Sequence, residues 1–221
     1  MTNTWIYALP AAGAAAAGGL LYAYKKGSRR LVWIFKPAAS LLFVLTGIAG
    51  GSGGSYPVLI VTGLCLAMAG DILLIPQNKK AFLGGLISFL MGHVLYAAGF
   101  ATLLSNASVS YPALIGILGI GVVVVACLWK HLGNMKVPVI AYVLVISTML
   151  WLSWMVFFRA GVNDNAGVLI AVGATCFYIS DLAVAIDRFV GEGFANKAWG
   201  IPLYYAGQFL IALSISAVRN I

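Results

Sequence analysis

Apolar runs of about 20 residues follow one another along almost the whole chain, with short polar connections between them. A helix of about that length spans the roughly 30 Å hydrocarbon core of a bilayer. The pattern therefore predicts an all-α, polytopic membrane protein. Its eight expected transmembrane helices cover about residues 5–24, 31–49, 56–76, 81–104, 111–129, 137–158, 166–187 and 199–218.

The composition supports one membrane domain. Hydrophobic residues make up 62% of the 221 residues and charged residues only 8%, whereas a soluble domain carries about 25% charged residues. No polar tract is long enough to fold by itself, so residues 1–221 are expected to form a single transmembrane domain. The formal charge of +8 does not indicate a nucleic-acid partner, because the basic residues lie between apolar runs and no soluble module presents them to a duplex.

The basic residues are divided unevenly between the two sides of the predicted membrane domain. The first, third, fifth and seventh connections hold Lys25, Lys26, Arg29, Arg30, Lys79, Lys80, Lys130, Lys136, Arg188 and Lys197, whereas the opposite side holds only Arg159 and Arg219. Cytoplasmic loops are enriched in Lys and Arg, so both termini are expected outside. The first run lacks a preceding basic segment, which favours a retained helix over a cleaved signal peptide. The basic inner loops are typical of a bacterial inner-membrane protein.

Two carboxylates interrupt these apolar runs. Asp71 lies in the third run and Asp181 in the seventh. A charge at the centre of a transmembrane helix costs roughly 2.5–3.5 kcal/mol on insertion scales, so a membrane-embedded aspartate indicates a functional site. Asp71 and Asp181 are therefore the candidate catalytic residues.

The predicted orientation places other polar side chains near these acids. Counted from the inner ends of their helices, Lys36 and Tyr204 lie about five residues deep, roughly 7–8 Å at 1.5 Å per residue, at about the depth of both acids. His93 and Gln208 lie deeper, and Asp187 lies nearer the interface. The acids, the lysine, the histidine, the glutamine and several tyrosines are expected to share one cavity that opens to the cytoplasmic leaflet.

The charged residues also have structural alternatives. Lys36 either extends its ammonium group to the inner interface or pairs with Asp71 or Asp181. Asp187 is expected to pair with Arg188 at the end of its helix. Asp181 and Arg188 are seven residues apart on nearly one helical face, so a salt bridge between them is a rival to a catalytic Asp181.

His93 and Gln208 have structural alternatives as well. The histidine could be hydrogen-bonded within the core, and an intramembrane amide can join helices. His93 and His131 lie on separate runs without metal-ligand spacing. The sequence therefore predicts neither a metal site nor a cofactor.

Two acids in one low-dielectric cavity can divide the work of acid–base catalysis. Desolvation and mutual repulsion leave one of them protonated beside an ionised partner. Such a pair can protonate one atom and activate water at another, as glycosidases do on acetal-type bonds. The chain shows no catalytic serine elbow, zinc-protease signature or Gly-rich phosphate loop.

The two halves of the chain show a weak similarity in the order of their motifs. Each half has a run that begins near a proline, Pro37 or Pro138, and then a run that ends in a small residue plus aspartate, Gly70-Asp71 or Ser180-Asp181. The next run in each half combines a polar residue with tyrosine: His93 with Tyr96, and Gln208 with Tyr204 and Tyr205. This order is consistent with a parallel four-plus-four pseudo-repeat, an arrangement known in membrane folds.

Taken in order along the chain, these motifs resemble those of the YhhN family, which includes the animal lysoplasmalogenases. The motifs are Lys36-Pro37, Gly70-Asp71, Gly92-His93 with Tyr96, Ser180-Asp181, Asp187-Arg188-Phe189 and Tyr204-Tyr205-Ala206-Gly207-Gln208. Their order and placement carry the resemblance, which covers essentially the whole chain, including the eight-helix plan.

The resemblance implies hydrolysis of the vinyl ether bond of a lysoplasmalogen, giving a fatty aldehyde and glycerophosphoethanolamine or glycerophosphocholine. The family's paired aspartates would correspond to Asp71 and Asp181, one protonating the vinyl ether and the other stabilising the cation and activating water. Lys36 would hold the ionised aspartate or meet the substrate phosphate. The supporting candidates are Lys36, His93, Tyr178, Asp187, Tyr204 and Gln208, and the expected partners are a vinyl ether lysophospholipid and the surrounding membrane lipids.

A small proton-coupled lipid or solute transporter is the second hypothesis. Asp71 and Asp181 would then be carrier sites. Two observations weigh against it: both acids are placed near the inner side rather than the midplane, and no run is broken by paired Gly and Pro.

Overall fold

The structure is a computed structural model in which residues 5–51, 53–76, 78–104, 111–159 and 164–218 are described. Within these ranges the chain forms eight α-helices and no strand: α1 (Trp5–Lys25), α2 (Arg29–Ala49), α3 (Ser55–Leu74), α4 (Lys79–Thr102), α5 (Tyr111–Leu128), α6 (Lys136–Phe158), α7 (Asp164–Ala185) and α8 (Phe194–Val218). A short 3₁₀ turn, η1 (Gly133–Met135), precedes α6, and a turn of π-helix, η2 (Ile186–Val190), continues α7. The all-α prediction is therefore confirmed for the described residues.

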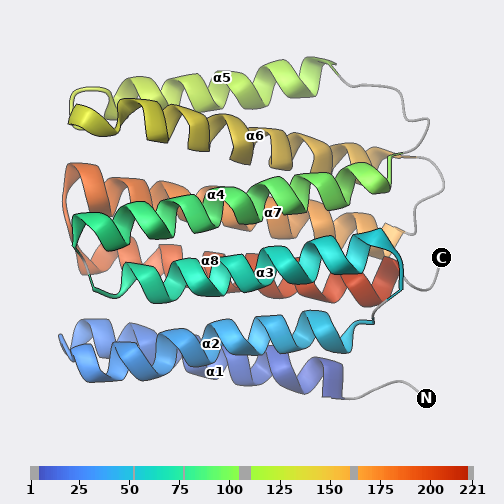
Figure 1. The fold of residues 1–221 in the computed structure, drawn as a ribbon, viewed down its shortest axis with the longest axis horizontal. Helices are drawn as coiled ribbons and strands as arrows, with labels where there is room; N and C mark the ends of the chain where they lie inside the picture. Colours follow the sequence, from blue (N-terminus) through green and yellow to red (C-terminus); the bar gives the residue numbers. More distant parts are fainter. Residues whose placement is uncertain (1–4, 52, 77, 105–110, 160–163, 219–221) are drawn as a thin grey trace.

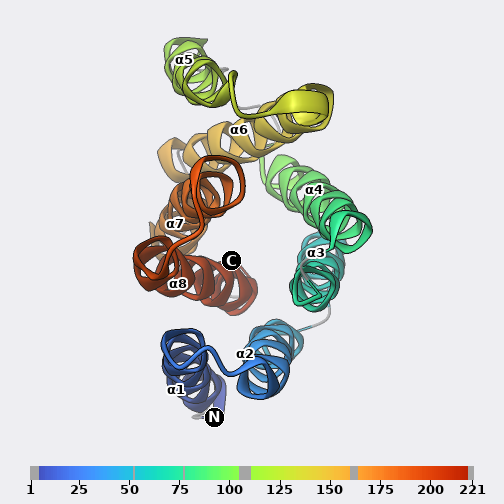
Figure 2. The same cartoon turned by 90° about the vertical axis from the view of Figure 1, so that its left-hand side faces the viewer.

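The helices run side by side along the long axis of the molecule (Figure 1). Figure 2, which looks along that axis, shows α1 and α2 at one edge, α5 and α6 at the other, and the pairs α3–α4 and α7–α8 facing each other between them. The first turn of α1 and the last turn of α8 lie at the same end of the bundle. The described basic connections lie at the opposite end, whereas Arg219 is outside the described residues.

Six described segments are long and apolar enough to cross a membrane: Arg29–Ala49, Ser55–Leu74, Lys79–Thr102, Gly133–Phe158, Asn165–Val190 and Phe194–Val218. A seventh apolar segment, Ala113–Leu128, is shorter. Together with the composition, these segments make the chain an integral membrane protein. The full set of eight spans and the external position of both termini stay predictions from the sequence.

Glycines bring the central helices into close contact. A Cβ atom added at Gly207 of α8 would lie 2.8 Å from the carbonyl oxygen of Gly173 on α7. A Cβ atom at Gly63 of α3 would lie 2.5 Å from the ring of Tyr96 on α4. Such small-residue contacts are how membrane helices gain packing contacts where lipid provides no hydrophobic driving force. The α3–α4 and α7–α8 pairs are accordingly the most extensively packed in the molecule.

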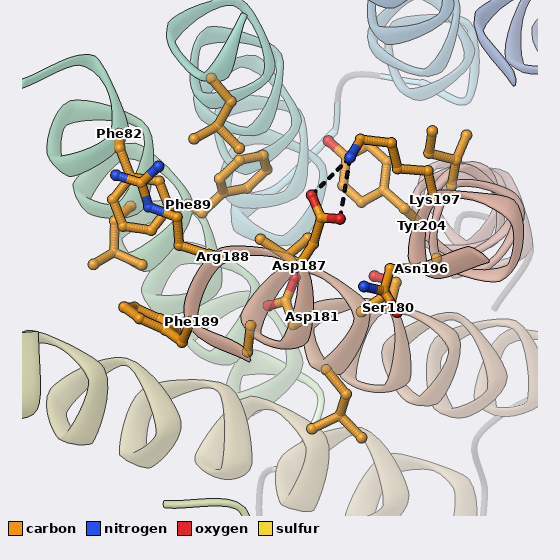
Figure 3. Close-up of a pocket in the computed structure, with 18 of the residues that line it drawn as sticks. Phe82, Phe89, Ser180, Asp181, Asp187, Arg188, Phe189, Asn196, Lys197 and Tyr204 are labelled. Atoms are coloured by element: carbon orange, nitrogen blue, oxygen red, sulfur yellow. Dashed lines mark hydrogen bonds and ion pairs between the residues drawn. The ribbon is translucent and has the colours of Figure 1, made fainter. Parts of the chain in front are cut away.

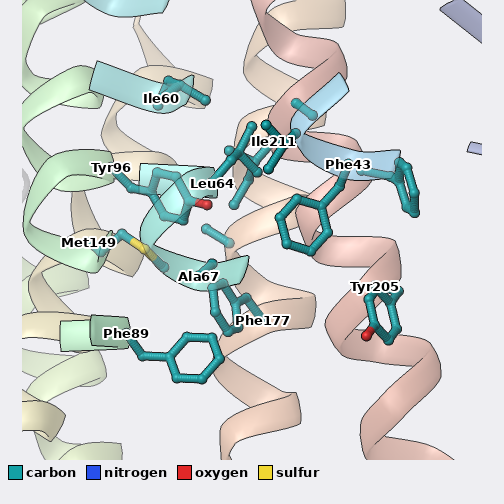
Figure 4. Close-up of a cluster of buried hydrophobic side chains, with 14 of the residues drawn as sticks. Phe43, Ile60, Leu64, Ala67, Phe89, Tyr96, Met149, Phe177, Tyr205 and Ile211 are labelled. Atoms are coloured by element: carbon teal, nitrogen blue, oxygen red, sulfur yellow. The ribbon is translucent and has the colours of Figure 1, made fainter. Parts of the chain in front are cut away.

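The core is built from α2, α3, α4, α6, α7 and α8, with a smaller contribution from α1. Figure 4 shows its large side chains, among them Phe43, Leu64, Tyr96 and Phe177, converging from these helices. A buried hydrogen bond of 2.6 Å joins the hydroxyls of Tyr56 and Ser214 and ties α3 to α8. This core supports the cavity that lies toward the basic end of the bundle.

The contacts between helices agree in part with the proposed pseudo-repeat. Helix α2 packs against α3 and α8, and α6, its expected counterpart, packs against α7 and α4. The outer helices differ, because α1 packs extensively against both α2 and α8, whereas the extensive contacts of α5 are with α6 alone. The inner three helices of each half are thus arranged alike, and the first helix of each half is not.

Candidate active site

A cavity of about 590 Å³ opens among the helix ends at the basic end of the bundle. This volume lies within the roughly 300–1,000 Å³ typical of small-molecule sites. Its deeper wall includes Asp71 and Asp181, and its exposed mouth is formed by Arg188, Gly191 and Glu192. Aromatic and aliphatic side chains from α4, α5 and α6 cover much of the remaining wall: Phe82, Leu86, Phe89, Val124, Leu128, Val139, Val143 and Ile146.

Asp71 is buried and has three donor groups around its carboxylate. The ammonium nitrogen of Lys36 lies 3.3 Å from Oδ1. The hydroxyls of Ser40 and Tyr204 both donate to Oδ2, each over 2.6 Å. A buried carboxylate needs a cation and well-aligned donors to remain ionised. Lys36 pairs with Asp71 and does not extend to the interface, so the second of its two predicted alternatives is confirmed.

Asp181 has different surroundings. The hydroxyl of Tyr142 on α6 donates to Oδ2 over 2.6 Å, and Nε2 of His93 on α4 lies 4.0 Å from the same oxygen. Among the described residues no Lys or Arg forms an ion pair with Asp181. The predicted alternative of an Asp181–Arg188 salt bridge is therefore wrong.

The environments of the two acids meet at Phe177 of α7. Its ring centroid lies 5.2 Å from that of Tyr204, which donates to Asp71. It also lies 4.7 Å from the ring centroid of His93, the neighbour of Asp181. Both acids line the same cavity, so the sequence-based expectation that α3 and α7 bring their carboxylates to one place agrees with the geometry.

His93 is almost fully buried at 1% exposure, with no hydrogen-bonding partner for either ring nitrogen among the described residues. The backbone carbonyl of Phe89, one turn earlier, approaches the ring, but outside hydrogen-bonding geometry. The ring instead packs edge-on against Tyr142 at 5.2 Å between centroids. The nearest carboxylate to the imidazole is Asp181.

Gln208 and Tyr178 do not contact the carboxylates, and neither Gln208 nor His93 is part of the cavity wall, so the expectation that both share the cavity with the acids is wrong. Gln208 accepts a hydrogen bond of 2.8 Å from the hydroxyl of Tyr96, and its amide nitrogen lies 3.4 Å from the hydroxyl of Tyr204. It thereby joins α8 to α4 and supports the tyrosine that contacts Asp71. Tyr178 lines the cavity, and its hydroxyl lies 3.4 Å from Ser147 Oγ on the α6 side.

Asp187 belongs to the mouth of the cavity. Its carboxylate accepts hydrogen bonds from the Lys197 ammonium at 2.9 and 3.1 Å and from the backbone N–H of Gly193 at 2.9 Å. The expected Asp187–Arg188 pair is wrong, because consecutive helical side chains do not face each other. Arg188 instead places its guanidinium 4.2 Å from the ring centroid of Phe82 (Figure 3).

Sequence reasoning did not single out Ser40 and Tyr142. Each lies one turn after a proline that begins the corresponding half-repeat, Pro37 in α2 and Pro138 in α6. The similarity between the two halves could have indicated them. Ser40 of α2 contacts Asp71, and Tyr142, at a similar distance from its own proline on α6, contacts Asp181. Hydropathy could not identify them, because serine and tyrosine are unremarkable within membrane helices.

Comparison with known proteins gives a consistent result. The family model described as the YhhN family matches residues 31–215. An uncharacterized membrane protein YhhN from Escherichia coli O6:H1 is 29% identical over 188 residues, covering 83% of this chain and 86% of the relative. A lysoplasmalogenase from Mycobacterium tuberculosis is 29% identical over 196 residues, covering 85% and 71%. Lysoplasmalogenase TMEM86A from Bos taurus is 31% identical over 191 residues, covering 86% and 75%. No solved structure matches.

Proposed function

The chain belongs to the YhhN family, and on that premise we propose that it is a membrane-embedded hydrolase that cleaves the vinyl ether bond of a lysoplasmalogen. The names of the mycobacterial and bovine relatives support this substrate class. The observation that carries the proposal is the pair of carboxylates in one cavity, one with a lysine partner and the other with none. The products are a fatty aldehyde and glycerophosphoethanolamine or glycerophosphocholine.

The surroundings of the acids support different roles for them. Asp71 is the ionised base, because Lys36 and two hydroxyl donors stabilise its negative charge. Asp181 is the protonated acid, because it lies between membrane helices without a cation partner. The pair then holds one proton before the substrate binds, which is the starting state for acid–base catalysis.

The reaction follows from these roles. Asp181 gives its proton to the β-carbon of the vinyl ether, and the adjacent carbon becomes an oxocarbenium ion that the Asp71 carboxylate stabilises. Water adds to that carbon while Asp71 takes one of its protons, which forms a hemiacetal. The hemiacetal collapses to the aldehyde when its hydroxyl proton passes to Asp181 and Asp71 protonates the departing glycerol oxygen. Both acids return to their starting states.

The other predicted residues have supporting roles. Tyr142 orients Asp181, and Tyr204, held by Gln208, orients Asp71. The buried imidazole of His93 packs beside Asp181 and supports the position of that acid. Tyr178 contributes to the cavity wall, and Asp187 shapes the mouth through Lys197.

The proposal includes the placement of the protein in the membrane. The whole chain is one transmembrane domain of a bacterial inner membrane, with both termini on the periplasmic side. The cavity then opens toward the cytoplasm, because its mouth lies at the end that carries the basic connections. The lysophospholipid would enter from the cytoplasmic leaflet.

Aldehyde release from a purified lysoplasmalogen tests the proposal. We expect activity in the wild type and its loss, by at least about a hundredfold, in Asp71→Asn and Asp181→Asn, since removing a general acid or base costs typically 10²–10⁴-fold. Asp164→Asn is the matched acid-to-amide control and should leave turnover intact, because Asp164 begins α7 at the end of the bundle opposite the cavity mouth.

Two results would contradict the proposal. A wild type that releases no aldehyde would contradict the hydrolase. Full activity in either aspartate variant would contradict the catalytic role of that aspartate. An inert wild type that carries protons into vesicles when a solute is added would favour the proton-coupled transporter instead.

A further inference from the structure

The mouth of the cavity carries two basic side chains with different partners. Lys197 is fully engaged, with the Asp187 carboxylate at 2.9 and 3.1 Å and Glu192 at 3.2 Å. Arg188, on the other side of Asp187 in Figure 3, contacts the face of Phe82. In the described part of the chain no carboxylate forms an ion pair with Arg188. Deeper in the cavity, the charge of Lys36 is committed to Asp71.

The contact with Phe82 holds the guanidinium while leaving its donors available. A cation above an aromatic face is attracted by the ring and makes no hydrogen bond to it. The ring is itself supported edge-on by Phe189, at 6.2 Å between centroids. Arg188 thus presents a fork of N–H groups at the cavity mouth, and that fork matches the oxygens of a phosphate.

The position of Arg188 along α7 and η2 suits one end of a lysophospholipid. Asp181 and Arg188 are seven residues apart, which is roughly 10 Å along a helix axis, with Arg188 nearer the mouth. In a lysoplasmalogen the vinyl ether and the phosphate are attached to opposite ends of the glycerol. With the vinyl ether at the acids, the phosphate is directed toward the mouth.

We propose that Arg188 binds the phosphate of the substrate headgroup and selects phosphate-bearing ether lipids over neutral ones. The identity of the lipid rests on the proposed function, whereas phosphate binding rests on the geometry of the mouth. Lys197 has a different role, because its charge holds η2 to the start of α8 through Asp187. An exposed arginine can also anchor a helix end to the phosphates of the bilayer, so the experiment has to separate the two sources of phosphate.

Binding of two non-cleavable ligands tests the proposal independently of catalysis. The ligands are a 1-O-alkyl-glycerophosphoethanolamine and the matching 1-O-alkylglycerol, titrated into protein in a neutral detergent that lacks phosphate. Arg188→Gln should lower the affinity for the phosphate ligand about ten- to a hundredfold, as expected for a lost hydrogen bond to a charged group. Its affinity for the alkylglycerol should be unchanged, and Arg188→Lys should retain part of the difference.

Lys80→Gln is the matched control. Lys80 is exposed at the start of α4, at the same end of the bundle, and is not part of the cavity wall. If only the total positive charge mattered, Lys80→Gln would weaken binding of the phosphate ligand as much as Arg188→Gln does. Retained binding of alkylglycerol by Arg188→Gln also shows that this variant is folded.

Each outcome has a definite meaning. Equal affinities for the phosphate ligand in wild type and Arg188→Gln would overturn the headgroup role, and this is the result expected of an arginine that only anchors the helix end to the bilayer. Equal losses for both ligands would also overturn it, and this is the result expected of a structural arginine. Kinetics with the alkenyl forms of the same ligands should show a raised KM for the phosphate substrate alone. A wild type that binds the ligands with the Arg188-dependent difference but releases no aldehyde would contradict the hydrolase and leave the phosphate site standing.

Discussion

Asp71 and Asp181 are the same side chain in unlike surroundings. Asp71 contacts an ammonium group and two hydroxyls, whereas Asp181 contacts one hydroxyl and the edge of an imidazole. A cation beside a buried carboxylate stabilises the ionised form far more than a hydroxyl does. The position of Lys36 on α2, with Val137 at the corresponding place on α6, is what makes the pair asymmetric.

Removing the lysine should therefore disable the base. We expect Lys36→Met to lower aldehyde release at least about a hundredfold, because the Asp71 carboxylate loses its cation and an unpaired buried charge is costly. The same variant should unfold at a lower temperature. The double variant Lys36→Met with Asp71→Asn should recover part of that thermal stability without recovering activity, since the unpaired charge is gone. Wild-type turnover in Lys36→Met would contradict the assignment of Asp71 as the base.

The hydroxyl that contacts Asp181 can be tested with a pair of tyrosine variants. Tyr142→Phe should lower kcat about tenfold or more, because Tyr142 donates to the carboxylate that forms when Asp181 gives up its proton, and hydrogen bonds to charged groups are worth about 1.5–3 kcal/mol. Tyr56→Phe removes a hydrogen bond of the same 2.6 Å length from the core between α3 and α8.

We expect the core variant Tyr56→Phe to lose about 0.5–1.5 kcal/mol of stability and to keep its kcat. Equal changes in kcat for the two tyrosine variants would show that the effect at Tyr142 is structural. The measurements are steady-state kinetics and thermal unfolding of the same preparations.

At the scale of the helices, the site depends on two close pairings, α3 with α4 and α7 with α8. These pairings bring His93 of α4 toward Asp181 of α7 and Tyr204 of α8 toward Asp71 of α3. Each acid is thus contacted by a helix of its own half, α2 or α6, and by a helix of the other half. A small change in the spacing of one pair would separate the acids from their partners.

Gly207 is the position where this spacing is most sensitive. We expect Gly207→Ala to destabilise the protein by about 1–3 kcal/mol, because the new methyl group meets the Gly173 carbonyl at 2.8 Å and the Phe177 amide nitrogen at 3.0 Å, and backbone yields little. Activity should fall as well, since Phe177 lies between the environments of the two acids.

Gly119→Ala on α5 is the control for this variant. Nothing lies within 4 Å of a Cβ atom there, and alanine favours helix by about 1 kcal/mol over glycine. Thermal unfolding in detergent measures both variants. Equal stability of Gly207→Ala and the wild type would show that the α7–α8 pair tolerates wider spacing.

For the whole molecule, the division of charge predicts one orientation in the membrane. The end with the cavity mouth carries the described basic connections, and Arg159 is at the opposite end. Because positive loops are retained in the cytoplasm, a reporter active only outside the cytoplasm should work when fused to the C-terminus. Single cysteines at Lys80 and Lys130 should be inaccessible to an impermeant thiol reagent in intact cells, and one at Arg159 accessible. Labelling in the reverse pattern would place the cavity mouth outside.

Much of the architecture was predictable because hydropathy is local along the chain. The apolar runs predicted eight helices, which the described residues confirm. The two acids were predicted to be the centre of a site because each lies inside an apolar run, where a charge is costly. The order of motifs indicated the YhhN family, and the comparisons confirm it.

Only the tertiary structure decided which side chains meet. Lys36 could pair with either acid, Asp187 bonds to Lys197 rather than to Arg188, and Ser40 and Tyr142 contact the acids without any sequence signal strong enough to select them. The physical reason is that hydropathy measures how deep a residue lies and not the direction in which its helix turns it. That rotation is set by contacts between glycines and rings of different helices, which a one-dimensional pattern does not contain.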